Sequence, residues 1–303
     1  MSDINFRRPP RLRAGARIAL IAPAGPVTEE RIATSAERCI ALGLDPIIGS
    51  SAHLRTGYLA GDDAARARDV MWAFTDPQID AVWALRGGYG VMRLASLLDF
   101  DIMARSLRPY IGFSDNTFIH LMLNARGVVS YHGPHPGAEF PSETEAAFLQ
   151  VLFGDGAAGV LPLRAEDPAP RMLAPGFALG PLVGGNLSLL AACCGTPAQM
   201  RAAGCIVFIE EVGEHAYRVD RCFAQLDLAG ALDGVAGFAF GRFTESEDDA
   251  IPLLTEVAQR YAVPAVVDFP IGHIEHNWTI PVGVQAALDA ENCSLEILQP
   301  AVG

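Results

Sequence analysis

The chain has 303 residues, with 22 Lys and Arg against 35 Asp and Glu, which gives a formal net charge of −13. This acidic balance argues against a general nucleic-acid-binding function, because such binding needs basic surface to displace counterions. Hydrophobic residues make up 50% of the sequence, which excludes overall disorder. No apolar run approaches the ~18 residues of a membrane span.

The first half alternates short apolar runs with amphipathic stretches. We expect strands at residues 17–22, 45–48, 80–85, 110–113 and 128–131, and helices at residues 28–42, 62–75, 91–98 and 115–126. Thr28 is the N-cap candidate of the first helix, and Glu29 and Glu30 follow in its first turn. This alternation predicts a mostly parallel sheet with helices on both faces and ligands at the carboxyl ends of its strands.

The alternation is lost between residues 133 and 181, where Gly, Pro, Ala and acidic residues are frequent, and we place an inter-domain linker near residues 155–175. The second half resumes with expected helices at residues 187–192, 216–229 and 251–261, and strands at 205–210, 235–240, 265–269, 279–288 and 294–298. We therefore expect two α/β domains, at residues 1–160 and 161–303, the second smaller and with a more mixed sheet.

The N-terminal segment superficially resembles an export signal, because five arginines precede the apolar residues 18–22. That apolar stretch is too short and is interrupted by Pro23 and Pro26. We interpret it as a buried strand and expect a cytoplasmic protein. The six cysteines include no C-x-x-C pair, so nothing in their spacing requires an oxidising compartment.

A candidate nucleophile lies in the segment Gly112-Phe-Ser-Asp-Asn116, which follows an expected strand and opens an expected helix. A serine on such a sharp turn has an exposed hydroxyl, and the helix N-terminus offers free N–H groups to a developing oxyanion. The G-x-S-x-G pattern is incomplete, because Asn116 replaces the second glycine; asparagine tolerates unusual backbone angles. The alternative is that Ser114 or Asp115 merely caps the helix.

A nucleophilic serine needs a base and an orienting acid. His273 follows a buried strand and the adaptable Gly272, which makes it a reasonable base. Glu210 and Glu211 end an apolar strand, but the sequence does not choose between them or exclude Glu214. A metal site is the alternative, since His132 and His135, and His273 and His276, are pairs three apart. Neither spacing matches a specific zinc signature, so we expect no metal.

The glycine-rich segment Arg86-Gly-Gly-Tyr-Gly90 follows another expected strand. It lacks the Lys-Ser/Thr of a P-loop and the G-x-G-x-x-G fingerprint. Gly87 and Gly88 would instead direct backbone N–H groups at a substrate oxygen, and Arg86 would hold a carboxylate. The alternative for this segment is a tight turn between a strand and a helix.

Taken together, these motifs resemble those of the L,D-carboxypeptidase family of serine peptidases. The matching segments occur in the family's order and run from about residue 17 to the end. They are residues 18–23, 86–90, 112–115, 130–134, 184–187, 195–197, 208–214, 217–221 and 269–273. Each match alone is weak, but the ordered set is highly specific.

The resemblance implies a catalytic triad of Ser114 as nucleophile, Glu210 as orienting acid and His273 as base. It also implies a first domain similar to class I glutamine amidotransferases, an active site between the domains, and a homodimer. The backbone N–H groups of Asp115 and Gly88 would then form the oxyanion hole, and no cofactor is needed.

The substrate implied by the resemblance is a murein tetrapeptide, cut during cell-wall recycling between the L-centre of a diamino acid and the terminal D-Ala. Microcin-immunity peptidases, which hydrolyse a peptidyl–nucleotide antibiotic, are relatives and give one alternative function. A ligand-binding relative that has lost catalysis gives another. Neither nucleic acid nor a membrane is an expected partner.

Overall fold

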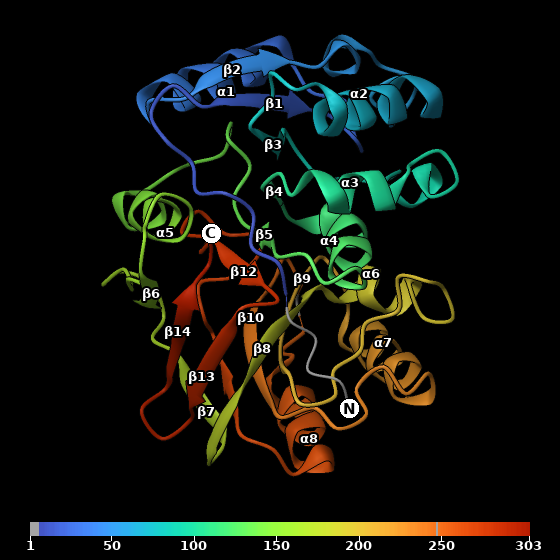
Figure 1. Ribbon diagram of the computed structural model, residues 1–303. Coiled ribbons are helices and arrows are strands. Elements are labelled where there is room, and N and C mark those ends of the chain that lie inside the picture. Colours follow the sequence, from blue (N-terminus) through green and yellow to red (C-terminus); the bar gives the residue numbers. More distant parts are fainter. Residues whose placement is uncertain (1–5, 247) are drawn as a thin grey trace.

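The computed structural model describes residues 6–246 and 248–303 as two β-sheets with helices packed against them (Figure 1). The first sheet has six strands in the order β12-β5-β4-β3-β1-β2. Its members are β1 (Arg17–Ile21), β2 (Asp45–Ile48), β3 (Ala81–Ala84), β4 (Tyr110–Gly112), β5 (Ser130–His132) and β12 (Ile280–Val282). The five strands from the first half are parallel, and only β12 runs antiparallel, beside β5.

Four helices of the first half connect these parallel strands, and the fifth follows β5 and leads to the second sheet. They are α1 (Glu29–Ala41), α2 (Asp63–Thr75), α3 (Phe100–Ser106), α4 (Thr117–Asn124) and α5 (Ser142–Leu152). The Thr28 hydroxyl caps α1 by accepting from the Arg31 N–H, which confirms the predicted N-cap. Asp62 caps α2 in the same way, through the Ala65 N–H.

The second sheet has eight strands in the order β6-β14-β13-β8-β9-β10-β11-β7. They are β6 (Ala157–Val160), β7 (Arg171–Ala174), β8 (Phe177–Asn186), β9 (Ile206–Val212), β10 (Gly237–Thr244), β11 (Ala265–Val267), β13 (Gln285–Asp289) and β14 (Ser294–Pro300). Strands β8 to β11 are parallel, and the flanking strands are antiparallel. Its helices are α6 (Leu187–Ala192), α7 (Ala216–Leu228) and α8 (Ile251–Tyr261). The predicted α/β fold with a parallel and a more mixed sheet is therefore confirmed.

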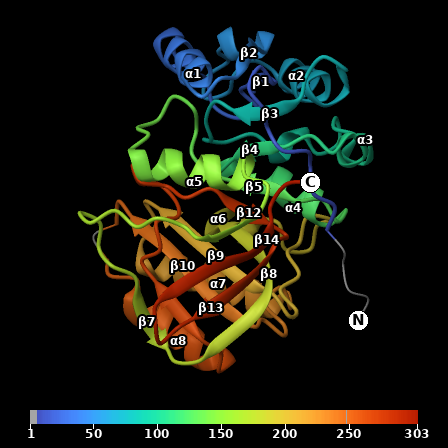
Figure 2. The ribbon, with the colours of Figure 1, turned by 60° about the vertical axis from the view of Figure 1, so that its left-hand side comes forward.

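Several predicted elements were wrong. Residues 91–98 form no α-helix but one short 3₁₀ turn at Met92–Leu94, and helices α3 and α5 were not predicted. The single strand expected at 279–288 is two strands, because Gly283 turns the chain with a φ of +100°. Figure 2 shows the result: β12 lies at the junction of the two sheets, while β13 continues in the second.

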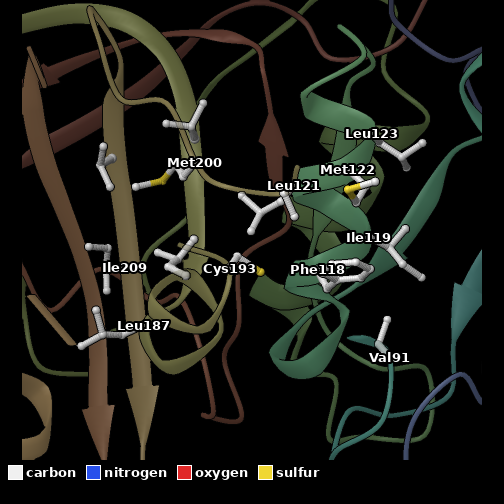
Figure 3. Packing of buried hydrophobic residues seen from close by; sticks show 14 of the residues in the cluster. Val91, Phe118, Ile119, Leu121, Met122, Leu123, Leu187, Cys193, Met200 and Ile209 are labelled. Carbon is white, nitrogen blue, oxygen red and sulfur yellow. The ribbon is translucent and has the colours of Figure 1, made fainter. Parts of the chain in front are cut away.

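One hydrophobic cluster joins the two halves (Figure 3). Leu121 on α4 points toward Cys193 and Met200 from the second half, and the same cluster includes Ile209 on β9. Because α4 and β9 bury their apolar side chains together, the segments that precede α4 and that end β9 are held in a fixed relation. None of the helices in the described ranges is long and apolar enough to cross a membrane.

Candidate active site

Ser114 lies at the carboxyl end of β4, where the chain turns into α4. Its φ is +63°, in the left-handed region that non-glycine residues rarely adopt. Asn116 has ordinary helical backbone angles. The residue with unusual backbone angles is therefore Ser114, and not Asn116, where we expected them. The Asn116 side chain fixes the turn by donating to the Phe113 carbonyl and accepting from the Tyr110 hydroxyl at 2.6 Å. A strained serine between a strand and a helix is the arrangement of an exposed nucleophile.

The glycine-rich segment that follows β3 packs directly on this serine. A Cβ atom at Gly87 would lie 2.6 Å from Ser114 Cβ and 2.7 Å from Ser114 Oγ. The same position would lie 3.3 Å from the Asp115 nitrogen. The backbone at Gly87 therefore faces both the Ser114 hydroxyl and the Asp115 amide. Only glycine fits at this position.

Two backbone amides beside Ser114 donate no hydrogen bond within the described ranges, those of Gly88 and Asp115. The Gly87 carbonyl accepts from the Gly25 N–H at 3.2 Å and from Arg86 Nε at 3.1 Å. In a trans peptide the N–H points opposite to the carbonyl, so the Gly88 N–H points away from Gly25 and Arg86. Both amides remain available to an oxygen atom.

Gly87→Ala tests this close approach. We expect kcat to fall about 10²-fold, because the added methyl group must displace the serine side chain, and a misplacement of about 1 Å costs that much. Steady-state kinetics with a cleavable peptide measure the effect. Gly156→Ala is the matched control, since a Cβ there meets nothing within 4 Å. Equal kcat values for the two variants would contradict a role for the close approach of Gly87 to Ser114.

Glu210 and His273 form a direct pair at the ends of β9 and of the segment after β11. His273 Nδ1 lies 2.7 Å from Glu210 Oε2, the glutamate is fully buried, and the imidazole is 22% exposed. Because the carboxylate accepts, Nδ1 carries the proton and Nε2 keeps its lone pair. Gly272 permits this contact, since a Cβ there would lie 2.7 Å from Glu210 Oε2.

The pKa of His273 is raised above its ordinary value. Burial alone would lower it, but the hydrogen bond and negative charge of Glu210, together with the charges of Glu211 and Glu245, outweigh burial. The second oxygen of Glu210, Oε1, is buried without a hydrogen-bond partner in the described ranges. His273 is thus the group that offsets the buried charge of this carboxylate.

Glu211 has different surroundings. Its carboxylate accepts from Asn186 Nδ2 and the Val212 N–H, and from both the N–H and the hydroxyl of Ser188. Burial raises its pKa, and these hydrogen bonds lower it in part. Glu211 therefore holds the start of α6, while its neighbour Glu210 faces the imidazole, as alternation along a strand requires.

The ring of Phe113 connects the serine to the base. Its centroid lies 4.8 Å from that of His273, edge to face, and 4.3 Å from that of His135. Phe113 directly precedes Ser114, so the turn that carries Ser114 packs against the imidazole. The structure thus pairs Glu210 with His273 and packs the residue before Ser114 against that imidazole, and the triad of Ser114, Glu210 and His273 stays a prediction.

The histidines of the metal alternative have different hydrogen-bond partners. His276 Nδ1 contacts Asp167 Oδ2 at 2.6 Å, whereas His132 is buried with neither ring nitrogen hydrogen-bonded in the described ranges. Burial lowers the pKa of His132 well below its ordinary value, so the ring is neutral. No group of three His, Cys, Asp or Glu side chains in those ranges is placed to hold a metal ion.

The contacts of two buried charged side chains near the serine were not predicted from the sequence. The Asp115 carboxylate accepts from the Val91 N–H at 2.8 Å, and burial raises its pKa to about 6. Arg66 is fully buried and donates to the carbonyls of Pro23 and Gly90. Together they fix the end of the glycine-rich segment. The only sequence signal for this role of Arg66 was its position in α2, at a spacing that places it on the buried face of the helix.

Arg86 holds the loops around the site together. Its guanidinium donates to the carbonyls of Gly87 and, at 3.0 Å, Pro26. The structure thus shows a structural role for Arg86. The residue ties the glycine-rich segment to the segment that follows β1. Its expected binding of a substrate carboxylate stays a prediction.

Comparison with known proteins covers most of the chain. The LD-carboxypeptidase N-terminal domain family matches residues 18–133, and the LD-carboxypeptidase C-terminal domain family matches residues 179–288. A carboxypeptidase homologue of Streptomyces coelicolor is 41% identical, over 97% of each chain. The murein tetrapeptide carboxypeptidase of Pseudomonas aeruginosa is 33% identical, over 90% of this chain and 93% of its own.

Solved structures share the same fold. The muramoyltetrapeptide carboxypeptidase of Oxalobacter formigenes is 30% identical, with a TM-score of 0.81, over 93% of this chain and 98% of its own. A microcin C7 self-immunity protein bound to glutamyl sulfamoyl guanosine has a TM-score of 0.88 at 22% identity, over 98% and 99% of the two chains. These matches, together with the two domain families, show that the chain belongs to the LD-carboxypeptidase family.

Proposed function

We propose that the protein is a serine carboxypeptidase that removes the terminal D-Ala from murein tetrapeptides by cutting an L,D bond. The observation that carries the proposal is the buried Glu210–His273 pair packed, through Phe113, against the strained turn of Ser114. Membership of the family supports the peptidase activity. Relatives named as murein tetrapeptide carboxypeptidases, at 30–33% identity, support the substrate.

In the proposed mechanism Ser114 Oγ attacks the scissile carbonyl while His273 Nε2 accepts its proton. The imidazolium then returns that proton to the nitrogen of the leaving D-Ala, which breaks the C–N bond and leaves an acyl-enzyme. A water molecule, deprotonated by His273, hydrolyses this ester and restores Ser114. Glu210 keeps the proton on Nδ1 and stabilises the transient imidazolium.

The negative charge that develops on the carbonyl oxygen would be bound by the free amides of Gly88 and Asp115. These amides are fixed before the reaction, so they need no reorganisation when the charge appears. Loss of one such donor costs about 2.7–4 kcal/mol of the barrier in comparable sites. The Arg86 contacts and the Asp115 side chain keep the two donors in place.

The stereochemistry at the substrate terminus tests the reaction class. We expect release of D-Ala from L-Ala-γ-D-Glu-diaminopimelate-D-Ala, and at least about 10²-fold slower cleavage of the peptide that ends in L-Ala. Inversion exchanges methyl and hydrogen around a carboxylate held in place, so the scissile carbonyl leaves its donors. Mass spectrometry of the products measures both rates. Amidation of the terminal carboxylate should also suppress cleavage.

The outcomes of this assay separate the candidates. Equal rates on the L-Ala and D-Ala peptides would overturn the L,D specificity. Cleavage of a peptidyl-adenylate analogue, with none of the three peptides cut, would favour the microcin-immunity activity suggested by the shared fold. Absence of labelling by a fluorophosphonate probe would favour a non-catalytic binding protein, because such probes require an activated serine.

The organisation of the protein is also proposed from the family. We propose a domain boundary near residue 160, which lies between the two matched regions. We further propose that the protein is a cytoplasmic homodimer. Light scattering coupled to size-exclusion chromatography tests the dimer, and a monomer at micromolar concentration would contradict it.

A further inference from the structure

An open cavity of about 760 Å³ lies beside the glycine-rich segment, at the edge of the proposed active site. Three loops that follow β1, β2 and β3 line it, with Gly25, Pro26, Arg55, Gly57, Tyr58, Arg86, Gly88 and Tyr89. Its size is within the range of about 300–1,000 Å³ that is typical of ligand pockets. Gly88 belongs both to this wall and to the proposed oxyanion hole, so a ligand in the cavity adjoins the scissile carbonyl.

The charge of this cavity is opposite to that of the protein. Its lining includes two arginines and no carboxylate, in a chain whose formal net charge is −13. Arg55 is exposed, and its side chain makes no ion pair or hydrogen bond in the described ranges. Arg93, next to the two tyrosines, adds no free charge because Asp63 holds it at 2.9 Å.

A third arginine, Arg31, increases the positive potential. Arg31 lies close enough to Arg86 for the two charges to repel, and this repulsion lowers the pKa of Arg31 after the larger effect of its burial. Neither guanidinium is paired with a carboxylate in the described ranges. Like charges gathered without a counter-charge are costly, and an anionic ligand would offset that cost.

The cavity also has an apolar wall. Tyr58 and Tyr89 pack edge to face, with ring centroids 5.6 Å apart, and are 63% and 56% exposed. Large aromatic rings left this exposed are typical of ligand-binding surfaces. A ligand that carries both a carboxylate and apolar groups matches the arginine and tyrosine side chains together.

We propose that this cavity binds the acyl part of the peptide substrate and that Arg55 recognises a carboxylate there, remote from the bond that is cut. The proposal rests on the proposed function. A cavity of this volume is far larger than the single small residue that a carboxypeptidase releases, so it suits the remaining part of the peptide. In a murein peptide that part offers two carboxylates, on γ-D-Glu and on the far centre of diaminopimelate. Arg55 is then a specificity-determining residue.

Binding of the product tripeptide L-Ala-γ-D-Glu-diaminopimelate, measured by isothermal titration calorimetry, tests the proposal without requiring turnover. We expect Arg55→Gln to weaken binding about tenfold, the effect of one charge-assisted hydrogen bond. Arg55→Lys keeps the charge and should restore part of the affinity. Arg201→Gln, at an exposed arginine outside the cavity lining, is the matched control and should bind like the unaltered protein.

Two amidated tripeptides identify the carboxylate that Arg55 recognises. One is blocked on γ-D-Glu, and the other on the far centre of diaminopimelate. The peptide that lacks the recognised charge should bind equally to the unaltered protein and to Arg55→Gln. Unchanged affinity of Arg55→Gln for the unmodified tripeptide, or no detectable tripeptide binding, would overturn the subsite. The proposed function has its own outcome: it fails if no tetrapeptide is cleaved, whatever the effect of Arg55→Gln on binding.

Discussion

Ser114→Ala should reduce turnover by about 10⁶, the loss found when a triad nucleophile is removed. The hydroxyl is the proposed attacking group, and in the structure its oxygen lies 2.7 Å from the position that a Cβ at Gly87 would take. The measurement is D-Ala release at saturating tetrapeptide. Residual activity within tenfold of the unaltered enzyme would remove Ser114 from its proposed role.

The same substitution should leave the fold intact, which separates chemistry from stability. Ser114 is half-buried and its side chain makes no hydrogen bond in the described ranges, so alanine loses little packing. Alanine must still adopt the φ of +63°, so we expect the thermal midpoint to change by no more than a few degrees. A fluorophosphonate probe should label the unaltered protein and not this variant. Labelling of both would place the reactive serine elsewhere.

Regular elements with unbroken apolar patterns could be predicted from the sequence, and those defined by tertiary contacts could not. Helix α8 and strand β2 have the predicted bounds, because their apolar spacing and flanking turns agree. Helix α5 starts after Pro141 without a side-chain cap and lies in a stretch rich in Gly and Pro, so local signals did not reveal it. The glycine that divides residues 279–288 was a readable signal of a break.

The candidate site shows the same division. The motif around Ser114 predicted a serine between a strand and a helix, and the structure has that arrangement. The sequence alone did not choose between Glu210 and Glu211, because alternation shows that the two differ without showing which one faces the imidazole. Arg55 lies 31 residues before Arg86 in the sequence (86 − 55 = 31), and only the folding of three loops brings both to one cavity. No motif of the sequence carries that information.

Glu210→Gln should reduce kcat by about 10⁴, because the amide no longer fixes the proton on Nδ1 or stabilises the imidazolium. Glu211→Gln is the matched control one residue away. Its carboxylate contacts only the start of α6 and the β9 backbone, so it should retain kcat within about tenfold. It should instead lose about 1–3 kcal/mol of stability, as a buried hydrogen-bonded group does. Equal losses of kcat, or the reverse order, would contradict the assignment of Glu210.

The pH profile gives an independent test of the same pair. A general base must be neutral, so activity falls as the pH drops through the pKa of His273. Because Glu210 raises that pKa, the acidic limb of the unaltered enzyme should lie above the ordinary histidine value. Glu210→Gln removes the charge that raises it, so the limb of the residual activity should move to lower pH. Glu211→Gln, whose charge acts on His273 only from a distance, should move the limb far less. A limb that stays in place in Glu210→Gln would show that another group controls the reaction.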